Sequence, residues 1–221
     1  PRIAPHLDVR RFAARVAGDV SRNDVAEALS ELITAEDPEL VSAALDSLTR
    51  IAAAKGSLSH SVIVALIDVV HGKDPTRRLL ALRALGATDA PRARMALRAC
   101  LKDGDSFLRA ESLRALSAHG ALEATRVEAF LSDPDAGVRL AAAETLGKVG
   151  DNGSCRELAD FAFAFEGYHH REVAKLLRNL APEETSRRML DVLDQVDRRR
   201  EWQVAIKVLE EVNRGPVNLF G

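Results

Sequence analysis

Residues 101–116 read Leu101-Lys-Asp-Gly-Asp-Ser-Phe-Leu-Arg-Ala-Glu-Ser-Leu-Arg-Ala-Leu116, and residues 131–146 read Leu131-Ser-Asp-Pro-Asp-Ala-Gly-Val-Arg-Leu-Ala-Ala-Ala-Glu-Thr-Leu146. The two segments align without gaps at an offset of 30 residues. Each has an Asp, an Arg six residues later and a Leu seven residues beyond that: Asp103, Arg109 and Leu116, then Asp133, Arg139 and Leu146. Self-similarity at such a period predicts a tandem array of one small unit.

Further copies extend the array in both directions. Asp74–Leu85 keeps the Arg-to-Leu spacing through Arg78, but its Asp stands only four residues before the Arg. Asp37–Leu48 has Val41 at the Arg position, and Val9–Gly18 aligns Arg10 with Arg139. Towards the C-terminus the period continues in helices ending at Leu177 and Leu209, where His170 and Trp202 occupy the Arg position.

Each unit is predicted to be a pair of helices. The second helix follows the Asp-Pro or Asp-Gly turn and has apolar residues at i, i+3/i+4 and i+7. The first helices are expected at Asp24–Thr34, Ser61–Val70, Pro91–Leu101, Leu122–Leu131, Ser154–Phe163 and Glu183–Leu193. Gly18, Gly86, Gly120 and Gly150 follow second helices, which predicts left-handed caps there.

The predicted fold is all-α, an α-α superhelix of six helical hairpins preceded by one unpaired second helix at about Val9–Ala17. A lone pair of about 30 residues cannot bury its apolar face, so neighbours must stack into a right-handed solenoid. We expect one domain over residues 1–214 and a flexible tail over residues 215–221. The leading unpaired helix is either a cap or the edge of a longer solenoid.

The segment Asp133–Gly147 closely resembles the HEAT repeat, especially the short variety first named for phycobilisome bilin lyases. The resemblance is strong over residues 70–150 and loose at both ends. It implies that the Asp before each second helix and the Arg within it form a ladder between neighbouring repeats. The ladder residues implied are Asp103, Arg109, Asp133 and Arg139, with Asp74 and Arg78 as looser members. Val41, His170 and Trp202 should interrupt or cap it.

The composition limits the kinds of partner and the cellular compartment that we expect. Hydrophobic residues make up 47%, charged residues 29%, and the net charge is −2, so no overall field favours nucleic acid. The basic residues comprise 25 Arg and six Lys, which reflects either codon bias or recognition of carboxylates or phosphates. Cys100 and Cys155 lie in apolar helical patterns and are expected to be buried thiols. No apolar run is long enough to span a membrane, and we expect a cytoplasmic protein.

The resemblance also implies that second helices line the concave, binding surface. The position two residues before each anchor should point outward, which selects Arg15, Asp46, Arg83, Arg114, Glu144, Lys175 and Lys207. Five of these seven residues are basic although the chain is net acidic. They form either an ordinary solvated helix face or a mainly basic groove for an acidic peptide or protein.

Other candidate residues lie in the C-terminal third. Adjacent residues on a helix point about 100° apart, so His169 and His170 are a poor chelating pair. Trp202 is either an interface anchor or a cap on the last repeat. Phe161, Phe163 and Phe165 alternate, so one of them should be exposed or contact the next repeat.

The sequence has no motif typical of an enzyme: no GxSxG, P-loop, HExxH, GxGxxG or CxxC pattern occurs. We therefore predict a scaffold or adaptor that binds another protein, with no catalytic residue, cofactor or metal. Two alternatives rest on the family resemblance alone. One is a bilin lyase or chaperone-type subunit, and the other is a nucleic-acid-binding protein of the alkylpurine-glycosylase kind.

Overall fold

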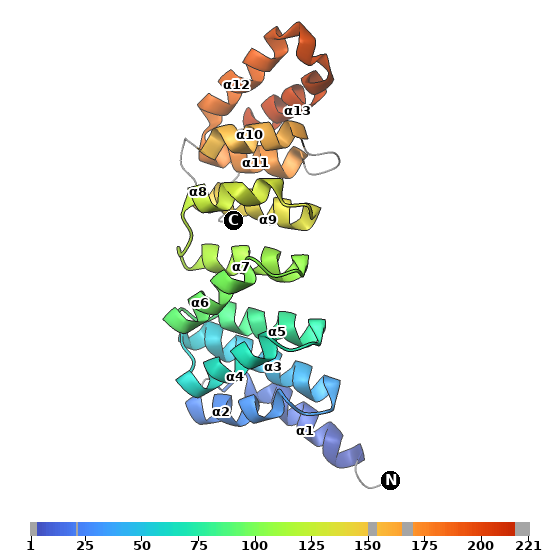
Figure 1. Ribbon diagram of the computed structural model, residues 1–221, viewed down its shortest axis with the longest axis vertical. Helices are drawn as coiled ribbons and strands as arrows, with labels where there is room; N and C mark the ends of the chain where they lie inside the picture. The colour runs from blue at the N-terminus through green and yellow to red at the C-terminus, as the bar shows by residue number, and fades with distance from the viewer. Residues whose placement is uncertain (1–3, 21, 150–153, 165–169, 215–221) are drawn as a thin grey trace. The chain divides into compact units, whose positions relative to one another are not determined.

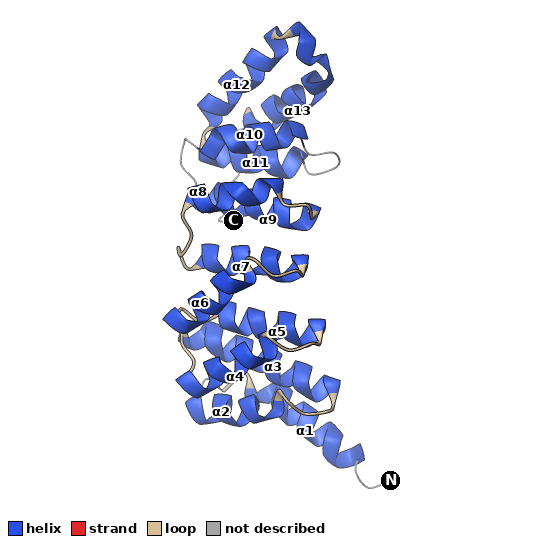
Figure 2. Ribbon diagram, viewed as in Figure 1, coloured by secondary structure: helices blue, strands red, loops and turns tan. Residues whose placement is uncertain are grey.

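The computed structural model describes residues 4–20, 22–149, 154–164 and 170–214. These residues form thirteen α-helices and two short 3-10 helices, and none of them is in a strand (Figure 2). The α-helices are α1 (Ala4–Ala17), α2 (Asn23–Leu32), α3 (Pro38–Lys55), α4 (His60–Val70), α5 (Pro75–Gly86), α6 (Pro91–Cys100), α7 (Ser106–Ala118), α8 (Ala124–Glu128), α9 (Ala136–Val149), α10 (Ser154–Ala164), α11 (His170–Leu180), α12 (Pro182–Asp194) and α13 (Trp202–Val212). The 3-10 helices are η1 (Ala129–Ser132) and η2 (Val196–Glu201).

The helices form six hairpins preceded by α1, which confirms the predicted element order (Figure 1). The hairpins are α2–α3, α4–α5, α6–α7, α8–α9, α10–α11 and α12–α13. The chain divides into two compact units, Pro1–His119 and Gly120–Gly221. In the first unit the second helices α1, α3, α5 and α7 pack successively on one another, and α2, α4 and α6 form the other layer. In the second unit α9, α11 and α13 form one layer and α8, α10 and α12 the other.

The prediction of a single right-handed solenoid over residues 1–214 concerns the placement of the two units and stays a prediction. The predicted tail, residues 215–221, lies outside the described residues. Five of the six predicted first helices agree with the structure within two residues at each end. The sixth, Leu122–Leu131, is instead a short α8 followed by η1, so this hairpin has an irregular first helix.

Aspartates cap the second helices α3, α5, α7 and α9, where the sequence has the Asp turn motif. Asp37 and Asp74 are the N-caps of α3 and α5, and each is followed by Pro in the first helical turn. The cap of α7 is Asp105, whose carboxylate accepts a hydrogen bond from the Phe107 N–H at 2.9 Å. Asp135 accepts the corresponding bond from the Val138 N–H at 3.0 Å. The second Asp of each Asp-x-Asp turn therefore caps the helix and leaves the first available for another role.

Two of the predicted left-handed glycines are not left-handed. Among the described residues only Gly56 and Gly120 have a positive φ, so the prediction holds for Gly120 and is wrong for Gly18 and Gly86; Gly150 lies outside them. Gly86 instead ends α5 where α7 packs closely. A Cβ on Gly86 would lie 2.8 Å from the Cβ of Ala115, so the missing side chain permits this helix contact.

The core lies between the layers and is built from Leu, Ala, Val and Ile. Leu45, Leu82 and Leu113, which are equivalent in three successive second helices, are all 0% exposed. Burying one such side chain contributes about 1.5–3 kcal/mol. Val62-Ile63-Val64 lies within α4, as its helical spacing predicts. Cys100 is a buried free thiol whose pKa is raised by burial, and the Cys155 side chain lies outside the described part.

Candidate functional surface

The structure places the predicted outward positions on the second helices. In the first unit Arg15, Asp46, Arg83 and Arg114 are all exposed, one each on α1, α3, α5 and α7. In the second unit Glu144 and Lys175 are half-buried and Lys207 is exposed, on α9, α11 and α13. The anchor Leu two residues later is fully buried in α3, α5 and α7, which fixes these side chains on the opposite side of each helix. Which surface is concave stays a prediction.

Two of the basic residues share a carboxylate that the sequence analysis did not select. The Arg83 Nε donates to the Glu111 Oε1 across α5 and α7 at 3.1 Å, and the Arg114 Nη1 lies 3.9 Å from the Glu111 Oε2. Arg83 and Arg114 keep 49% and 42% of their side chains exposed. The cluster has a net charge of +1, so a contacting carboxylate would meet two guanidinium groups and one acid.

An exposed aromatic side chain lies in line with this cluster. Phe107, Glu111 and Arg114 are spaced i, i+4 and i+7 and therefore share one face of α7. Phe107 is 73% exposed, although burying such a ring is favourable by about 1.5–3 kcal/mol. The composition of the repeat gave no reason to select it, since its equivalents are Thr76 and Gly137. We name Arg83, Phe107, Glu111 and Arg114 the α5–α7 cluster.

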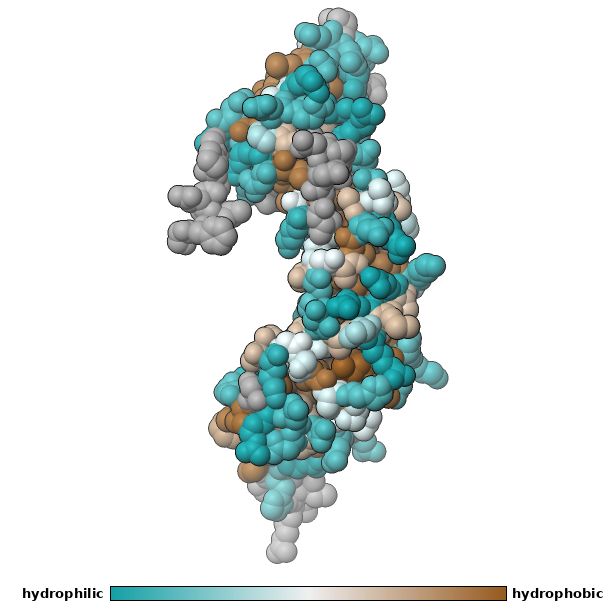
Figure 3. Space-filling model, turned by 90° about the vertical axis from the view of Figure 1, so that its left-hand side faces the viewer, coloured by the Kyte–Doolittle hydropathy of each residue, from teal (hydrophilic) through white to brown (hydrophobic). Residues whose placement is uncertain are grey.

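The rest of the predicted surface in the first unit carries both signs of charge, because Arg15 on α1 and Asp46 on α3 are both exposed. On α3, the neighbouring second helix, Glu39 and Asp46 are exposed. The layer of second helices in the first unit therefore exposes charges of both signs and is not uniformly positive. The face drawn in Figure 3 is mostly hydrophilic, with smaller apolar areas between the polar residues.

The ladder residues connect repeats within the first unit. The Arg78 Nη2 donates to the Asp103 Oδ2 at 2.5 Å, and the Arg78 Nε donates to the Val70 carbonyl at 2.7 Å. Arg78 is thus a full ladder member rather than a loose one. The preceding repeat offers Asp74 no Arg partner, because Val41 occupies the Arg position there. The Asp74 carboxylate caps α5 and lies 3.5 Å from the Nε of Arg77. The interruption expected at Val41 is what the structure shows.

Two other predicted ladder arginines bind their own turn. The Arg109 Nη1 donates to the carbonyls of Asp103 at 2.9 Å and Gly104 at 3.2 Å. The Arg139 Nη1 donates in the same way to Asp133 at 2.8 Å and Pro134 at 3.0 Å. These bonds tie each second helix to the turn that precedes it, and the ladder pairing of Arg109 and Arg139 stays a prediction.

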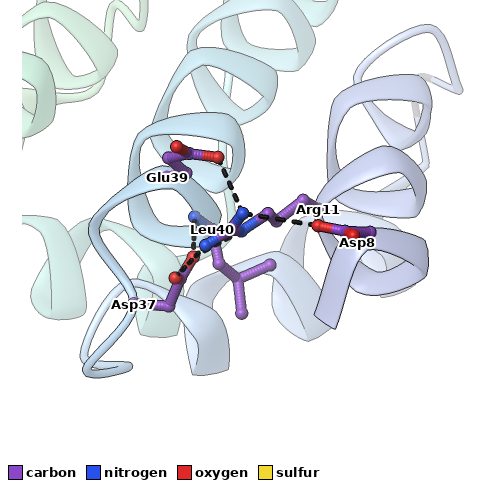
Figure 4. A network of polar contacts seen from close by, with 5 residues as sticks. All are labelled: Asp8, Arg11, Asp37, Glu39 and Leu40. Carbon is purple, nitrogen blue, oxygen red and sulfur yellow. Dashed lines mark hydrogen bonds and ion pairs between the residues drawn. The ribbon is translucent and has the colours of Figure 1, made fainter. Parts of the chain in front are cut away.

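A ladder contact that sequence alignment missed joins α1 to α3. The Arg11 Nε donates to the Asp37 Oδ1 at 2.9 Å, a second Arg11 nitrogen contacts the Asp37 Oδ2, and the Arg11 Nη1 lies 2.9 Å from Glu39 (Figure 4). The same Asp37 carboxylate accepts the Leu40 N–H at 2.7 Å, so one group both caps α3 and pairs with α1. Alignment placed Arg10 at this position, but Arg10 is exposed.

Asp37→Asn is expected to lower stability in a pH-dependent way. The hydrogen bond from Arg11 and that from the Leu40 N–H hold the pKa of Asp37 below its usual value. A lowered folded pKa contributes stability that is fully present above the unfolded pKa of about 3.9 and is lost as pH falls through the folded value. Because Asn also caps helices, the substitution removes mainly the charge. Urea unfolding across pH should show a gap from wild type at neutral pH that closes below about pH 4.

The matched control for this prediction is Asp46→Asn. Asp46 is an exposed carboxylate on the same helix, so its variant should change stability at neutral pH by no more than about 0.5 kcal/mol. A stability loss in Asp37→Asn that is the same at neutral and acidic pH would contradict a charge-dependent pair.

The C-terminal candidates are held by structural contacts. The Trp202 indole N–H donates to the carbonyls of Val192 at 3.2 Å and Gln195 at 3.3 Å, which end α12. Phe161 is buried, and Phe163 is half-buried with the Arg198 guanidinium 5.2 Å from its ring centroid. Arg198 is in η2, so Phe163 contacts the next hairpin, as one of the three phenylalanines was expected to. Phe165, His169 and the His170 side chain lie outside the described part.

Two general kinds of site are absent from the described residues. No group of three or more His, Cys, Asp or Glu among them is placed to hold a metal ion. No helix within the described ranges is both long and apolar enough to cross a bilayer.

Part of the chain matches a known repeat family. Residues 63–127 match the family model of HEAT repeats. The matched segment runs from α4 to α8 and includes the Arg78–Asp103 ladder contact. The helical hairpin, with its second helix packed on the second helix of the next repeat, recurs within both units. This match identifies HEAT repeats but does not distinguish the subtype named for phycobilisome lyases, which stays a prediction.

Several solved structures are similar to the chain. An archaeal HEAT-like repeats protein from Thermococcus onnurineus NA1 is 17% identical, with 93% of this chain and 96% of that one covered and a TM-score of 0.49. An engineered protein solved by the Northeast Structural Genomics Consortium is 21% identical, with 86% and 99% covered and a TM-score of 0.49. A second engineered protein is 18% identical, with 91% and 89% covered and a TM-score of 0.42. No curated protein matches the chain.

Proposed function

We propose that the protein is a non-catalytic binding module that contacts another protein through the α5–α7 cluster. The observation that supports this most is Phe107, which is 73% exposed on the same face of α7 as Arg114 and as Glu111, the partner of Arg83. Aromatic residues and Arg are enriched among the residues that dominate binding energy at protein interfaces. The proposed partner is an acidic segment with at least one apolar side chain to cover the ring.

The charges of the cluster favour such a partner over a polyanion. Glu111 lies between Arg83 and Arg114, and the neighbouring α3 exposes Glu39 and Asp46. These acidic side chains would repel the phosphates of a nucleic acid backbone. A peptide with few carboxylates, in contrast, fits a small basic site. Charges of this kind accelerate association and set specificity more than they add affinity.

Selection from a random peptide phage library on the immobilised protein tests the proposal. Wild type should enrich peptides that combine Asp or Glu with an aromatic or aliphatic residue. Phe107→Ala should weaken binding of the selected peptide by about 2 kcal/mol, which raises its Kd about thirtyfold. The double variant Arg83→Ala/Arg114→Ala should also lose binding, and raising the salt concentration should weaken binding only modestly.

The matched control removes the same charge from first helices. Arg92 on α6 and Arg126 on α8 are exposed, and Arg92→Ala/Arg126→Ala should bind the selected peptide like wild type. Equal loss in both double variants would point to general charge instead of the cluster. Binding of labelled duplex DNA that falls steeply with salt, without enriched peptides, would replace the proposal with the nucleic-acid alternative.

The remaining expectations form part of the same proposal. A cytoplasmic setting is proposed because Cys100 is a buried free thiol, which fits a reducing compartment. The resemblance to phycobilisome-lyase repeats stays a prediction about the kind of repeat and adds no bilin to the proposed function.

A further inference from the structure

The row of interhelical ion pairs in the first unit is interrupted between α3 and α5. Arg11 on α1 pairs with Asp37 at the start of α3, and Arg78 on α5 pairs with Asp103 before α7. The equivalent of Arg78 on α3 is Val41, a short apolar side chain that is 1% exposed. This junction therefore lacks the guanidinium that bridges the junctions on either side of it.

The acid of the pair is replaced at the same junction. Gly72 holds the position that Asp103 holds in the next repeat. A Cβ on Gly72 would lie 2.9 Å from the Val69 carbonyl oxygen, so this backbone leaves little room for a side chain. The carboxylate that the turn does offer is that of Asp74, the exposed N-cap of α5. Both members of the usual pair are thus replaced by small, uncharged residues.

A hollow of about 450 Å³ lies at this junction, between the end of α2, the last turns of α4 and the turn into α5. Ile33 and Gly72 are among the residues that line it, and they are equivalent in the repeat to Val70 and Asp103. At the next junction the Arg78 Nε donates to the Val70 carbonyl at 2.7 Å, and its Nη2 donates to Asp103. The hollow is therefore the counterpart of the space that the Arg78 guanidinium fills.

The lining of the hollow suits a guanidinium on an alkyl stem. Ile33, Ala65 and Val69 supply apolar surface, and Asp68 and Asp74 supply carboxylates. Within the described residues the Asp68 carboxylate makes no hydrogen bond or ion pair. Arg side chains lay their methylene groups along apolar surface and keep the charged head at polar groups. The volume also falls within the range of ligand pockets, about 300–1,000 Å³.

Two cations border the hollow without filling it. The Arg77 Nε lies 3.5 Å from the Asp74 Oδ2, which is longer than the usual hydrogen bond of about 2.7–3.2 Å. Asp74 keeps 51% of its side chain exposed. Asp37 shows that a cap carboxylate can also hold a guanidinium, because it caps α3 and binds Arg11. Lys73 is exposed at the rim, and its flexible stem can turn towards solvent.

We propose that the hollow binds the guanidinium of an arginine side chain on an extended segment of a partner protein. The planar guanidinium contacts Asp74 and Asp68, and its stem lies on Val69. The rim is open to solvent, so a docked segment gains contacts along the turn that a free small molecule lacks. The inference does not depend on the proposed function, because the α5–α7 cluster consists of other residues and favours an acidic partner.

A ¹H–¹⁵N NMR titration of the full chain with N-acetyl-arginine methylamide tests the proposal. Saturable shifts should centre on the amides of Gly72, Lys73 and Asp74, with a Kd of about 1 mM for a ligand of this size. N-acetyl-citrulline methylamide, which has a similar shape without the charge, should cause no saturable shift. N-acetyl-lysine methylamide should bind about fivefold more weakly, because an ammonium lacks the planar fork.

Three variants locate the binding. Asp74→Asn should raise the Kd of the arginine probe about tenfold, and its helix cap is retained because Asn also caps helices. The matched control is Asp105→Asn at the cap of α7, where Arg78 already fills the corresponding space; it should bind like wild type. Val41→Arg should abolish binding, because its own guanidinium would occupy the hollow. Far-UV circular dichroism confirms that the variants are folded.

Three outcomes would overturn the site. One is a wild type without saturable shifts at the turn, and another is equal binding of the arginine, citrulline and lysine probes. The third is binding that neither Asp74→Asn nor Val41→Arg weakens, which would place the probe elsewhere. Free L-arginine separates the two sources of a guanidinium: it should bind no more tightly than the blocked probe. Tighter binding of free L-arginine would replace the partner segment with a free amino acid.

Discussion

Glu211→Ala is expected to destabilise the second unit by about 3–5 kcal/mol, because it leaves a buried guanidinium without its acid. The Arg178 Nη1 donates to the Glu211 Oε1 at 3.1 Å and to the Glu211 carbonyl at 3.3 Å, which joins α11 to α13. The two side chains are only 5% and 7% exposed. Arg214 also contacts Glu211, at 3.0 Å, so one carboxylate balances more than one cation. Urea unfolding followed by Trp202 fluorescence reports on this region, because Trp202 is the only Trp and begins α13.

Two variants separate the buried pair from general charge effects. Glu210→Ala removes the exposed neighbouring carboxylate and should change stability by no more than about 0.5 kcal/mol. Arg178→Met/Glu211→Leu removes both buried charges and should recover most of the loss, since a well-packed apolar pair often replaces a buried ion pair at no cost. A double variant as unstable as Glu211→Ala would show that the interhelical hydrogen bonds, not the unpaired charge, account for the effect.

The order of the elements could be predicted from the sequence because the signals that set it are local. The spacing of apolar residues along each second helix and the Asp-Pro turns at Asp37 and Asp74 mark helix starts without reference to any neighbour. Hence the six hairpins and the leading helix agree with the structure. The irregular α8–η1 segment differs because nothing in its apolar spacing distinguishes an α-helical from a 3-10 turn.

The details that the sequence analysis missed depend on a neighbouring repeat. Position 86 requires Gly because a side chain there would collide with Ala115 on α7, not because its backbone is left-handed. Arg11, not Arg10, reaches Asp37, and one residue along a helix turns a side chain by about 100°, so the partner helix decides which one pairs. Glu111 was missed for the same reason: its role appears only when Arg83 approaches from α5.

The sequence predicts where the candidate surface lies but not its mixture of charged and aromatic side chains. The outward positions on the second helices are exposed or half-buried, as counting back from the buried Leu anchors implies. Charge counting along that row gave a mainly basic face, because it included one position per helix. The exposed acids beside the row, Glu39 among them, and the Phe107 ring lie at other positions of the same helices. One position per helix is therefore not enough to describe the whole surface.

Leu82→Ala is expected to destabilise the first unit by about 2–5 kcal/mol and to separate its unfolding from that of the second unit. Leu82 is 0% exposed in α5, at a position that is equally buried in α3 and α7, so truncation leaves a cavity between packed helices. In a repeat array each hairpin depends on its neighbours in sequence, and a weakened repeat lowers the stability of the compact unit around it. Far-UV circular dichroism, which reports on both units, should therefore detect an early transition in urea.

Trp202 fluorescence, which reports on the second unit, should show a smaller shift in its urea midpoint than circular dichroism does. The matched control is Met95→Ala, which truncates a side chain that is 67% exposed on α6 and should change stability by no more than about 0.5 kcal/mol. Coincident and equally shifted transitions for both probes in Leu82→Ala would mean that the two units unfold together. The coupling between them would then be stronger than the loss of a buried Leu, and the chain would unfold as a single cooperative array despite its division into two compact units.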